Sequence, residues 1–394
     1  MVSLLLAVIY IAFIGLGLPD SLLGAGWPVM RVEFGMNLDF AGVISMIISG
    51  GTILSSLLSD RLTRRFGASL VTACSVTLTA GALLGFSVSR SARELCLWAI
   101  PYGLGAGAVD AALNNYVALH FSARHMSWLH CFWGVGASIS PYIMSVSLAS
   151  EAGWRGGYRT VSILQIGISA LLFASLPLWK RVGAQTKEAS EASATEKRGS
   201  VWKIPGVPQV LLAFFSYCSL EWTAALWAAS YFVEYKGIDS QTAARFASLF
   251  FLGITFGRFV NGFLAERLGD RRSIRIGSVV MLIGMLLVAL PIPGGWNALA
   301  GLLIFGFGCA PVYPGIIHST PANFGRENSQ RIVGIQMASA YVGSTFMPSV
   351  FGFLARHIGI ALYPFYILAF TMLMIAMNEL LARRVPPQEE RNNA

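Results

Sequence analysis

The chain has 394 residues, of which 55% are hydrophobic and only 12% are charged, and its formal net charge is +9. Soluble domains carry about a quarter charged residues, so this chain has too little polar surface for a water-soluble globule, and we expect lipid to cover the rest. The basic residues stand in short stretches between apolar segments, which favours membrane orientation over nucleic-acid binding. Five cysteines without paired spacing predict neither a disulfide framework nor a metal site, and we expect no cofactor.

Apolar segments long enough to form membrane helices recur along the chain. Crossing the hydrocarbon takes about 20 helical residues. The first segment lacks a basic start and continues to Trp27, so we interpret it as a membrane helix and not as a cleaved signal. The predicted fold class is an all-α membrane protein with twelve transmembrane helices, at residues 3–30, 38–59, 68–89, 94–120, 127–150, 158–180, 205–235, 241–265, 273–292, 296–321, 329–355 and 360–382.

Lysine and arginine fix the expected orientation and the domain boundaries. They are more frequent in the connections on the side of the N-terminus, which predicts that both termini are cytoplasmic. The polar stretch 182–203, rich in Ala, Ser, Glu and Lys, predicts a flexible cytoplasmic linker. We therefore expect an N-terminal six-helix bundle at 1–181, the linker at 182–203, and a C-terminal six-helix bundle with a short cytoplasmic tail at 204–394.

A short charged motif occurs once in each half. An acid followed directly by arginine stands after the second helix as Asp60-Arg61 and after the eighth as Glu266-Arg267. Acid and guanidinium groups at helix ends can pair bidentately and cap a neighbouring helix, although arginine-rich loops also follow from the positive-inside rule alone. Repeated membrane halves place a substrate site near the midplane, between them.

Three acids fall inside predicted membrane helices. Counting about 1.5 Å per residue, Asp20 and Asp110 lie roughly 15 Å deep, and Glu221 stands midway along its helix, so all three are near the midplane of a roughly 30 Å core. An acid at this depth is costly and is a functional candidate. A buried carboxyl group can bind a proton on one side and release it on the other, which is the chemistry of cation coupling. The alternative is that each acid is a fixed hydrogen-bonding group.

Polar and aromatic side chains accompany these acids. Asp110 and Asn114 share a helix face at i, i+4, as do Asp20 and Trp27 at i, i+7. Aromatic rings beside carboxylates and amides suit a polyhydroxylated ligand, although such rings are also common in ordinary helix packing. The predicted substrate-binding residues are Asp20, Trp27, Asp110, Asn114, Glu221, Trp222, Trp227, Tyr231 and Tyr313.

The two charged motifs resemble the signature loop of the major facilitator superfamily, G-x-x-x-D-R-x-G-R-R. In the first copy Ser56 and Thr63 replace its two glycines, and in the second copy Glu266 and Asp270 depart from it. In that family this loop lies at the cytoplasmic contact between the halves. The resemblance therefore implies a cytoplasmic gate that comprises Asp60, Arg61, Arg64, Arg65, Glu266, Arg267 and Arg271. The resemblance implies the major facilitator fold, and the departures imply that the second loop holds its closed state less strongly.

Further motifs indicate one branch of that family. The relevant segments are Gly15 to Pro28, Gly103 to Asn114, Leu129 to Gly136, Glu221-Trp222, and Ala310 to Pro314. Together they resemble the fucose permease-like branch, which includes bacterial sugar–proton symporters and animal sodium–glucose carriers. The resemblance implies that the first, fourth, seventh and tenth helices line the central cavity. Fucose permease has acids in its first and fourth helices that match Asp20 and Asp110, although its fourth-helix acid is the longer Glu.

The leading functional interpretation is a monomeric secondary transporter in a bacterial inner membrane. It takes up a sugar or a related small polar metabolite by alternating access, coupled to H⁺, with Na⁺ as an alternative ion. A second interpretation is proton-driven export of a small amphipathic compound. A membrane enzyme or a non-transporting sensor is a remote alternative, because the chain shows no nucleophile motif such as GxSxG. His130 is interpreted as structural or as a proton relay, and Arg258 as part of the cytoplasmic network or as snorkelling to the interface.

Overall fold

The computed structural model describes residues 2–36, 40–187, 200–238, 240–292 and 295–385. These residues form α-helices, two short 3-10 helices and connecting turns, and no strand occurs among them. Contacts divide the chain into two compact units: the first comprises residues 1–116 and 132–199, and the second comprises residues 117–131 and 200–394. Compared with the predicted bundle 1–181, the first unit lacks the segment 117–131, which groups with the C-terminal helices, and it extends to residue 199.

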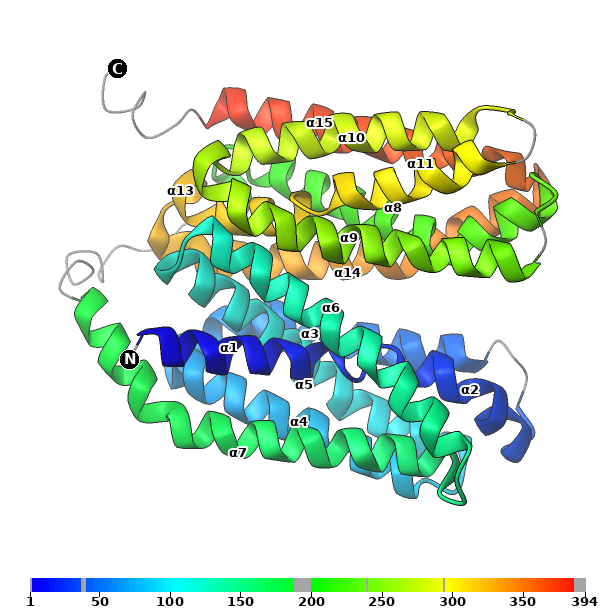
Figure 1. The fold of residues 1–394 in the computed structure, drawn as a ribbon. Coiled ribbons are helices and arrows are strands. Elements are labelled where there is room, and N and C mark those ends of the chain that lie inside the picture. The colour runs from blue at the N-terminus through cyan, green and yellow to red at the C-terminus, as the bar shows by residue number, and fades with distance from the viewer. Residues whose placement is uncertain (1, 37–39, 188–199, 239, 293–294, 386–394) are drawn as a thin grey trace. The chain divides into compact units, whose positions relative to one another are not determined.

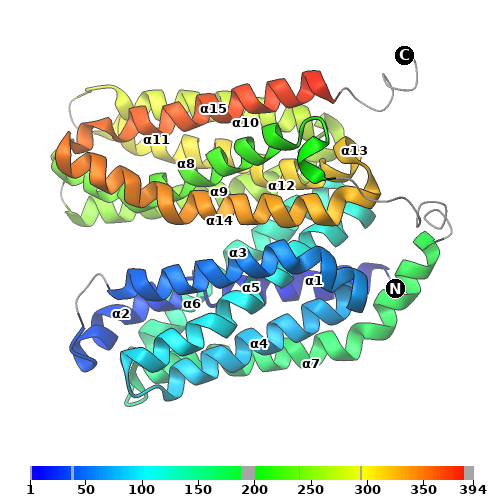
Figure 2. The ribbon, with the colours of Figure 1, turned by 180° about the vertical axis from the view of Figure 1, so that it is seen from behind.

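The first unit contains the segments of the chain that precede residue 200, apart from 117–131. The third and sixth predicted helices appear as α4 and α7, which lie side by side in both views (Figure 1; Figure 2). The helices are α1 (Val2–Gly17), α2 (Leu22–Glu33), α3 (Phe40–Phe66), α4 (Ala68–Val88), α5 (Ala92–His120), α6 (Ala123–Leu148) and α7 (Gly153–Lys187).

The second unit is arranged around α8, which packs against both α14 and α15, while α11 packs against α9 and α10 (Figure 1). Its elements are η2 (Val201–Lys203), α8 (Val207–Glu234), α9 (Ser240–Leu268), α10 (Asp270–Ala289), α11 (Trp296–Cys309), α12 (Val312–His318), α13 (Thr320–Phe324), α14 (Arg326–His357), η3 (Ile360–Leu362) and α15 (Tyr363–Arg384).

Ten segments of the described chain are long and apolar enough to cross a membrane. The remaining two predicted spans, 241–265 and 329–355, coincide with the helices α9 and α14. The all-helical fold class is therefore confirmed, whereas the twelve transmembrane helices and the cytoplasmic position of the termini stay predictions.

The predicted linker is shorter than expected on both sides. The helix α7 continues to Lys187, and η2 occupies Val201–Lys203, where the linker was expected to extend. Residues 188–199 lie outside the described part of the chain. A helix that leaves the apolar layer can continue in water when good helix formers such as Ala, Gln and Lys follow, because their intrinsic preference supports it.

Two glycines set the crossing of α1 and α6. A Cβ atom at Gly17 would lie 2.1 Å from the carbonyl oxygen of Trp133, and one at Gly136 would lie 2.2 Å from that of Ile14. Only glycine fits at such distances, because any side chain would force the backbones apart. This close crossing brings the Trp133 side of α6 next to the C-terminal end of α1.

At one end of the first unit, Glu33 connects α2 to α7. Its carboxylate accepts a hydrogen bond from the Trp154 indole at 2.7 Å and pairs with the Arg155 guanidinium at 2.6 Å. The same guanidinium lies over the Trp154 ring, 4.3 Å from its centroid, and donates to the Ser89 carbonyl at 2.9 Å. Partial burial raises the pKa of Glu33, but the bonds from Trp154 and Arg155 outweigh it and hold that pKa below its ordinary value.

Trp27 lies in the hydrophobic core of the first unit. Its side chain is 3% exposed, and its ring stacks on Phe40 with the centroids 6.3 Å apart. It belongs to a cluster of buried side chains that also includes Met30, Phe86 and Tyr158. This position makes Trp27 a packing residue in the described structure.

We expect Glu33→Gln to destabilise the protein in a pH-dependent manner, because glutamine cannot pair with the Arg155 charge. The folded-state pKa of Glu33 lies below the ordinary 4.5. The stabilisation is therefore present above that value and is lost as the pH falls through the lowered pKa. Thermal midpoints of the purified protein, measured from neutral pH to about pH 3, should differ most at neutral pH and converge in acid. The matched control Glu151→Gln changes an exposed acid near the same corner, and an equal effect there would contradict the assignment.

We expect Trp27→Ala to lower the thermal midpoint strongly, because removal of a buried tryptophan leaves a cavity that costs about 3–5 kcal/mol. Trp202→Ala removes a ring that is 64% exposed and serves as the control. Ligand affinity is measured on the folded fraction of both variants. An unchanged midpoint together with lost ligand binding would instead support the predicted role of Trp27 in stacking on a sugar.

Candidate functional site

The first predicted membrane helix is interrupted where Asp20 stands. The sequence predicted one helix over 3–30, but α1 ends at Gly17 and α2 begins at Leu22. Pro19 has no amide hydrogen to donate, and the turn closes through bonds from the Asp20 amide to the Gly17 carbonyl at 3.3 Å and from Leu22 to Pro19 at 3.1 Å. Asp20 thus precedes the N-terminus of α2, where the helix dipole favours negative charge. In transporters, such broken helices form substrate and ion sites.

Two aromatic donors hold the Asp20 carboxylate. The Trp133 indole donates to Oδ2 at 2.9 Å, and the Tyr102 hydroxyl donates to Oδ1 at 3.3 Å. Asp20 nevertheless remains exposed, so the carboxylate is fixed in position while a ligand or proton can reach it. The sequence did not identify Trp133 or Tyr102 as site residues. Their only signals were a tryptophan just before the glycines of α6 and a tyrosine directly after Pro101.

Asp110 and Asn114 form a buried pair on α5. Their relative exposures are 4% and 0%, and the Asn114 amide donates to the Asp110 carboxylate at 2.7 Å and to its carbonyl oxygen at 3.0 Å. The contact confirms that the i, i+4 spacing puts the two side chains on one face. Asp20, Asp110 and Asn114 thus give the first unit two carboxylates and one amide among the predicted site residues, and carboxylate and amide oxygens accept hydrogen bonds from hydroxyl groups.

The third intramembrane acid, Glu221, is paired with a cation. Its carboxylate lies 3.5 Å from the guanidinium of Arg258, and both side chains are buried. Both sequence-based alternatives for Arg258, the cytoplasmic network and snorkelling to the interface, are therefore wrong. The pair joins α8 to α9. Its two residues are too far apart in the sequence for a local pattern to predict their contact. A buried ion pair is broken only at high cost, because either partner left alone is an uncompensated charge.

Aromatic rings gather around Tyr313, at the break between α11 and α12. The sequence predicted one helix over 296–321, but α11 ends at Cys309 and α12 begins after Pro311. The Tyr313 ring packs edge-on against His130 and Phe214, with centroids 4.6 Å away in each case, and lies 6.2 Å from Tyr217. The Tyr217 hydroxyl donates to the Cys309 carbonyl at 3.0 Å, which satisfies a backbone oxygen freed at the break.

The other aromatic residues that were predicted to stack on a sugar lie on α8, and they are Trp222, Trp227 and Tyr231. Trp227 donates to the Pro348 carbonyl at 2.9 Å, and Tyr231 is fully buried with its ring stacked on Tyr363 at 4.9 Å. Trp222, on the same helix α8, is 42% exposed. Trp227 and Tyr231 therefore pack within the second unit, and a sugar-binding role for these three residues stays a prediction.

The first gate motif lies on a helix and not in a loop. Because α3 continues to Phe66, Asp60, Arg61, Arg64 and Arg65 are all helical, and the prediction of a loop is wrong. Thr63 stands within this helix, and its hydroxyl donates to the Ser59 carbonyl at 2.7 Å. Unlike the glycine of the family motif, it does not favour a left-handed residue that would end the helix. Asp60 is buried and pairs with Arg64, one turn further along, at 2.6 Å.

At the second gate motif, the helix α9 ends one turn earlier than α3 does at the first motif. Gly269, with φ of 73°, separates α9 from α10 at the position that corresponds to Thr63. Glu266, on the last turn of α9, accepts bonds from the Ser122 hydroxyl at 2.7 Å and from the Arg124 guanidinium at 2.5 Å. These contacts hold the segment 117–131 on the C-terminal helices within the second unit.

Asp270, which departs from the family motif, has a partner of its own. Its carboxylate lies 2.7 Å from His318 Nδ1, and His318 Nε2 lies 3.1 Å from the Phe121 carbonyl. Arg267 is exposed, whereas the Arg271 guanidinium donates to the Asn323 side-chain oxygen at 3.3 Å. Within the part of the chain that the structure describes, no group of three His, Cys, Asp or Glu side chains is arranged to hold a metal ion.

Known proteins resemble this chain in sequence over most of its length. The glucose/mannose transporter GlcP of Bacillus subtilis is 20% identical over 352 residues, which cover 87% of this chain and 86% of GlcP. The cis,cis-muconate transport protein of Acinetobacter baylyi is 22% identical over 351 residues, covering 83% and 81% respectively. These two relatives carry chemically different substrates, so sequence similarity alone leaves the substrate of this chain open.

Solved structures with the same fold include two sugar symporters. The proton:xylose symporter XylE superposes with a TM-score of 0.80 at 13% identity, covering 97% of this chain and 95% of XylE. The fucose:proton symporter FucP of E. coli superposes with a TM-score of 0.75 at 16% identity, covering 96% and 98%. The sequence also matches the family model of the Major Facilitator Superfamily over residues 9–247 and 210–394. The chain therefore belongs to the major facilitator superfamily, resembles its fucose permease-like branch, and is an integral multi-pass membrane transporter.

Proposed function

We propose that the chain takes up a sugar or a related small polar metabolite together with a proton, by alternating access across a bacterial inner membrane. The observation that carries this proposal is the Asp20 carboxylate, held in a helix break by two neutral donors while it remains exposed. Its protonation breaks no ion pair with either partner. A carboxyl group placed in this manner can gain and lose a proton during each transport cycle.

The contrast with Glu221 supports Asp20 as the coupling acid. Protonation of Glu221 would remove the counter-charge of Arg258, which is buried 3.5 Å away. That step leaves a guanidinium without its carboxylate in a region of low dielectric, which is costly. Glu221 and Arg258 therefore act best as a permanent neutral pair, although both Asp110 and Glu221 were also predicted as coupling candidates.

The chemistry of the first unit favours a neutral, hydroxyl-bearing substrate. Asp20, Asp110 and Asn114 present carboxylate and amide oxygens, which accept hydrogen bonds from hydroxyl groups. Two carboxylates would repel an anion such as muconate, which the relative in Acinetobacter carries. XylE, FucP and GlcP are named for sugars, and their substrates are neutral polyols of the kind that such acceptors bind. Asp110, paired with Asn114, is the better candidate for holding ligand hydroxyls.

Asp20→Asn should abolish accumulation of substrate against its gradient and retain exchange of labelled for unlabelled substrate. Asparagine keeps the size of the side chain but cannot bind and release a proton. The substrate is first identified by a thermal-shift panel that includes glucose, mannose, xylose and fucose. Uptake and exchange are then measured in liposomes with an imposed proton gradient.

The matched control for this variant is Glu94→Gln, which makes the same chemical change in the first turn of α5. Glu94 bonds the Ser91 hydroxyl and the Arg90 amide locally, so its loss should leave accumulation intact. Normal proton-driven accumulation by Asp20→Asn would exclude Asp20 as the coupling acid. Accumulation that depends on a sodium gradient alone would identify Na⁺, and not H⁺, as the coupling ion.

Asp110→Asn should weaken substrate binding by about tenfold or more, because a hydrogen bond to a charged acceptor is replaced by a neutral one. The half-saturating concentration in the thermal-shift titration measures this change directly. Asp20→Asn, tested in the same titration, should shift that concentration much less. If Asp110→Asn binds substrate as tightly as the wild type, the ligand hydroxyls are held elsewhere.

A further inference from the structure

The two side chains that bond the Asp20 carboxylate differ in what they can do when this group gains a proton. The Trp133 indole N–H can only donate a hydrogen bond, whereas the Tyr102 hydroxyl can donate one or accept one. They contact different oxygens, since Trp133 donates to Oδ2 at 2.9 Å and Tyr102 donates to Oδ1 at 3.3 Å. The two oxygens are therefore not equivalent as sites for a proton.

The indole favours protonation of the oxygen that it does not contact. A neutral carboxyl group has one carbonyl oxygen and one hydroxyl oxygen, and the carbonyl oxygen is the better acceptor. A proton on Oδ1 leaves Oδ2 as the carbonyl oxygen and so keeps the shorter bond, the one from Trp133. The backbone of Trp133 is fixed as well, because its carbonyl oxygen packs directly on Gly17. Trp133 can thus donate to Asp20 in both protonation states.

Tyr102 can accept the hydrogen bond of the new Oδ1–H group. Its side chain is 8% exposed, and its ring packs edge-on against Phe86 with the centroids 6.5 Å apart. The hydroxyl hydrogen can rotate about the C–O bond while the ring stays in place. The hydrogen bond between the two oxygens then reverses its direction without movement of either helix.

Tyr158 supplies an acceptor for the hydrogen that Tyr102 turns away from Asp20. The Tyr158 hydroxyl is buried and makes no hydrogen bond among the described residues. Its ring stacks on the same Phe86 ring, with the centroids 5.2 Å apart, and the two tyrosines interact electrostatically. A buried hydroxyl without a partner is costly. An acceptor role in the protonated state gives this hydroxyl a function that a phenylalanine could not perform.

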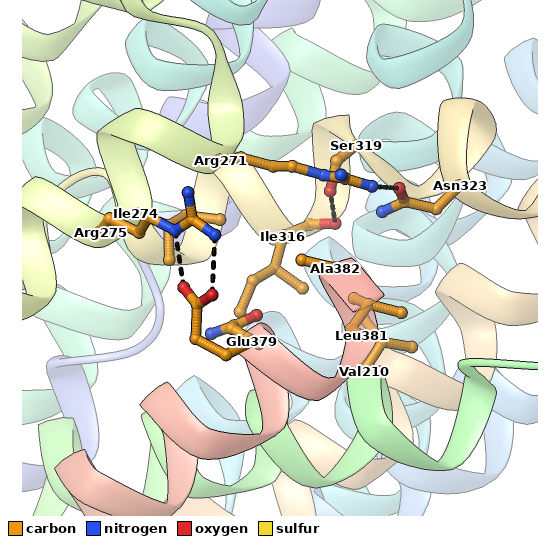
Figure 3. A pocket seen from close by; sticks show the side chains of 11 residues that line it. Val210, Arg271, Ile274, Arg275, Ile316, Ser319, Asn323, Glu379, Leu381 and Ala382 are labelled. Atoms are coloured by element: carbon orange, nitrogen blue, oxygen red, sulfur yellow. Dashed lines mark hydrogen bonds and ion pairs between the residues drawn. The ribbon is translucent and has the colours of Figure 1, made fainter. Parts of the chain in front are cut away.

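The charges around Asp20 permit this exchange, because its carboxylate is held by neutral donors. Glu379, by contrast, accepts two hydrogen bonds from the Arg275 guanidinium, at 2.6 and 2.7 Å (Figure 3), and its protonation would break an ion pair. The charged side chain that acts on Asp20 is Asp110 on α5, whose repulsion falls when Asp20 is neutral. The helices α3, α4 and α7 also pack on α1 or α2, and in the described part of the chain they present no charged group to Asp20.

We propose that Tyr102 reverses its hydrogen bond when Asp20 is protonated on Oδ1, that Tyr158 then accepts from Tyr102, and that Trp133 anchors Oδ2 in both states. The proton comes from water: an O–H bond of hydronium breaks as the Oδ1–H bond forms, and a water molecule leaves. Both tyrosines keep their own hydrogens throughout, so neither is ionised. This inference rests on the proposed coupling role of Asp20, and it explains how the site can bind and release a proton without rearrangement.

Infrared difference spectra of the purified full-length protein, recorded between about pH 8 and about pH 4, test the proposal. Protonation of Asp20 gives a carbonyl stretching band that is absent in Asp20→Asn. Trp133→Phe should raise the frequency of this band, because the carbonyl oxygen loses its donor. The matched control is Trp98→Phe, which removes a 39% exposed indole from α5 and should leave the band in place.

The hydroxyl of Tyr102 gives a second signature, measured with isotope-labelled tyrosine in the wild-type protein. Its C–O stretching band should change from the frequency of a donor to that of an acceptor as Asp20 is protonated. The change should be lost in Tyr102→Phe and in Asp20→Asn, and Tyr158→Phe should alter it because the turned hydrogen loses its acceptor. Tyr142→Phe, at a 72% exposed tyrosine, is the control and should leave the change intact. This signature decides the question if Trp133→Phe fails to fold.

The outcomes separate this inference from the proposed function. An Asp20 band that Trp133→Phe leaves unchanged, or a Tyr102 hydroxyl that remains a donor in acid, would overturn the inference while Asp20 could still couple transport. An unchanged tyrosine band in Tyr158→Phe would overturn the role of Tyr158. The accumulation assay with Asp20→Asn decides the coupling role separately, and the absence of any Asp20 band over the pH range would overturn both proposals.

Discussion

Every backbone amide and carbonyl in a membrane must find a partner inside the protein, because lipid offers none. This constraint accounts for the all-helical chain and for the importance of the few places where a helix stops in mid-span. Two such places are the turn at Leu18–Ser21 and the break at Ala310–Pro311. At the first, the amides of Asp20 and Leu22 bond carbonyls three residues back, and at the second, Tyr217 bonds the Cys309 carbonyl. Each break thus gathers polar and aromatic side chains that a continuous helix would not need.

The positions of the helices could be read from the sequence because each needs about 20 apolar residues, and this signal is local. The breaks within the first and tenth predicted helices could not be predicted from the sequence. Membrane helices tolerate proline and glycine without breaking, so these residues alone do not mark a break. The partners of Asp20 escaped prediction for a different reason. Trp133 reaches it through the crossing of α1 and α6 at Gly17 and Gly136, and a contact between distant segments leaves no periodic trace in either.

The charged residues show the same division between local and distant information. The Asp110–Asn114 contact follows from helical spacing and was predictable. The pairing of Glu221 with Arg258 joins two helices, and no local pattern in either helix predicted it. The gate motifs were recognised as repeats, but the substitution of Thr63 for glycine allows α3 an additional turn that its counterpart α9 lacks. The two helices therefore differ in length where the repeated motif predicted symmetry.

Under the proposed function, the open position of Asp20 has an electrical consequence. The fixed charges of a carrier move equally in both directions, so they contribute no net work over a complete cycle. With a neutral substrate and one proton bound to Asp20, each cycle transfers a single positive charge. A membrane potential contributes about 2.3 kcal/mol per elementary charge for each 100 mV, which adds directly to the pH gradient as a driving force. Voltage would thus concentrate the substrate even when the pH is equal on both sides.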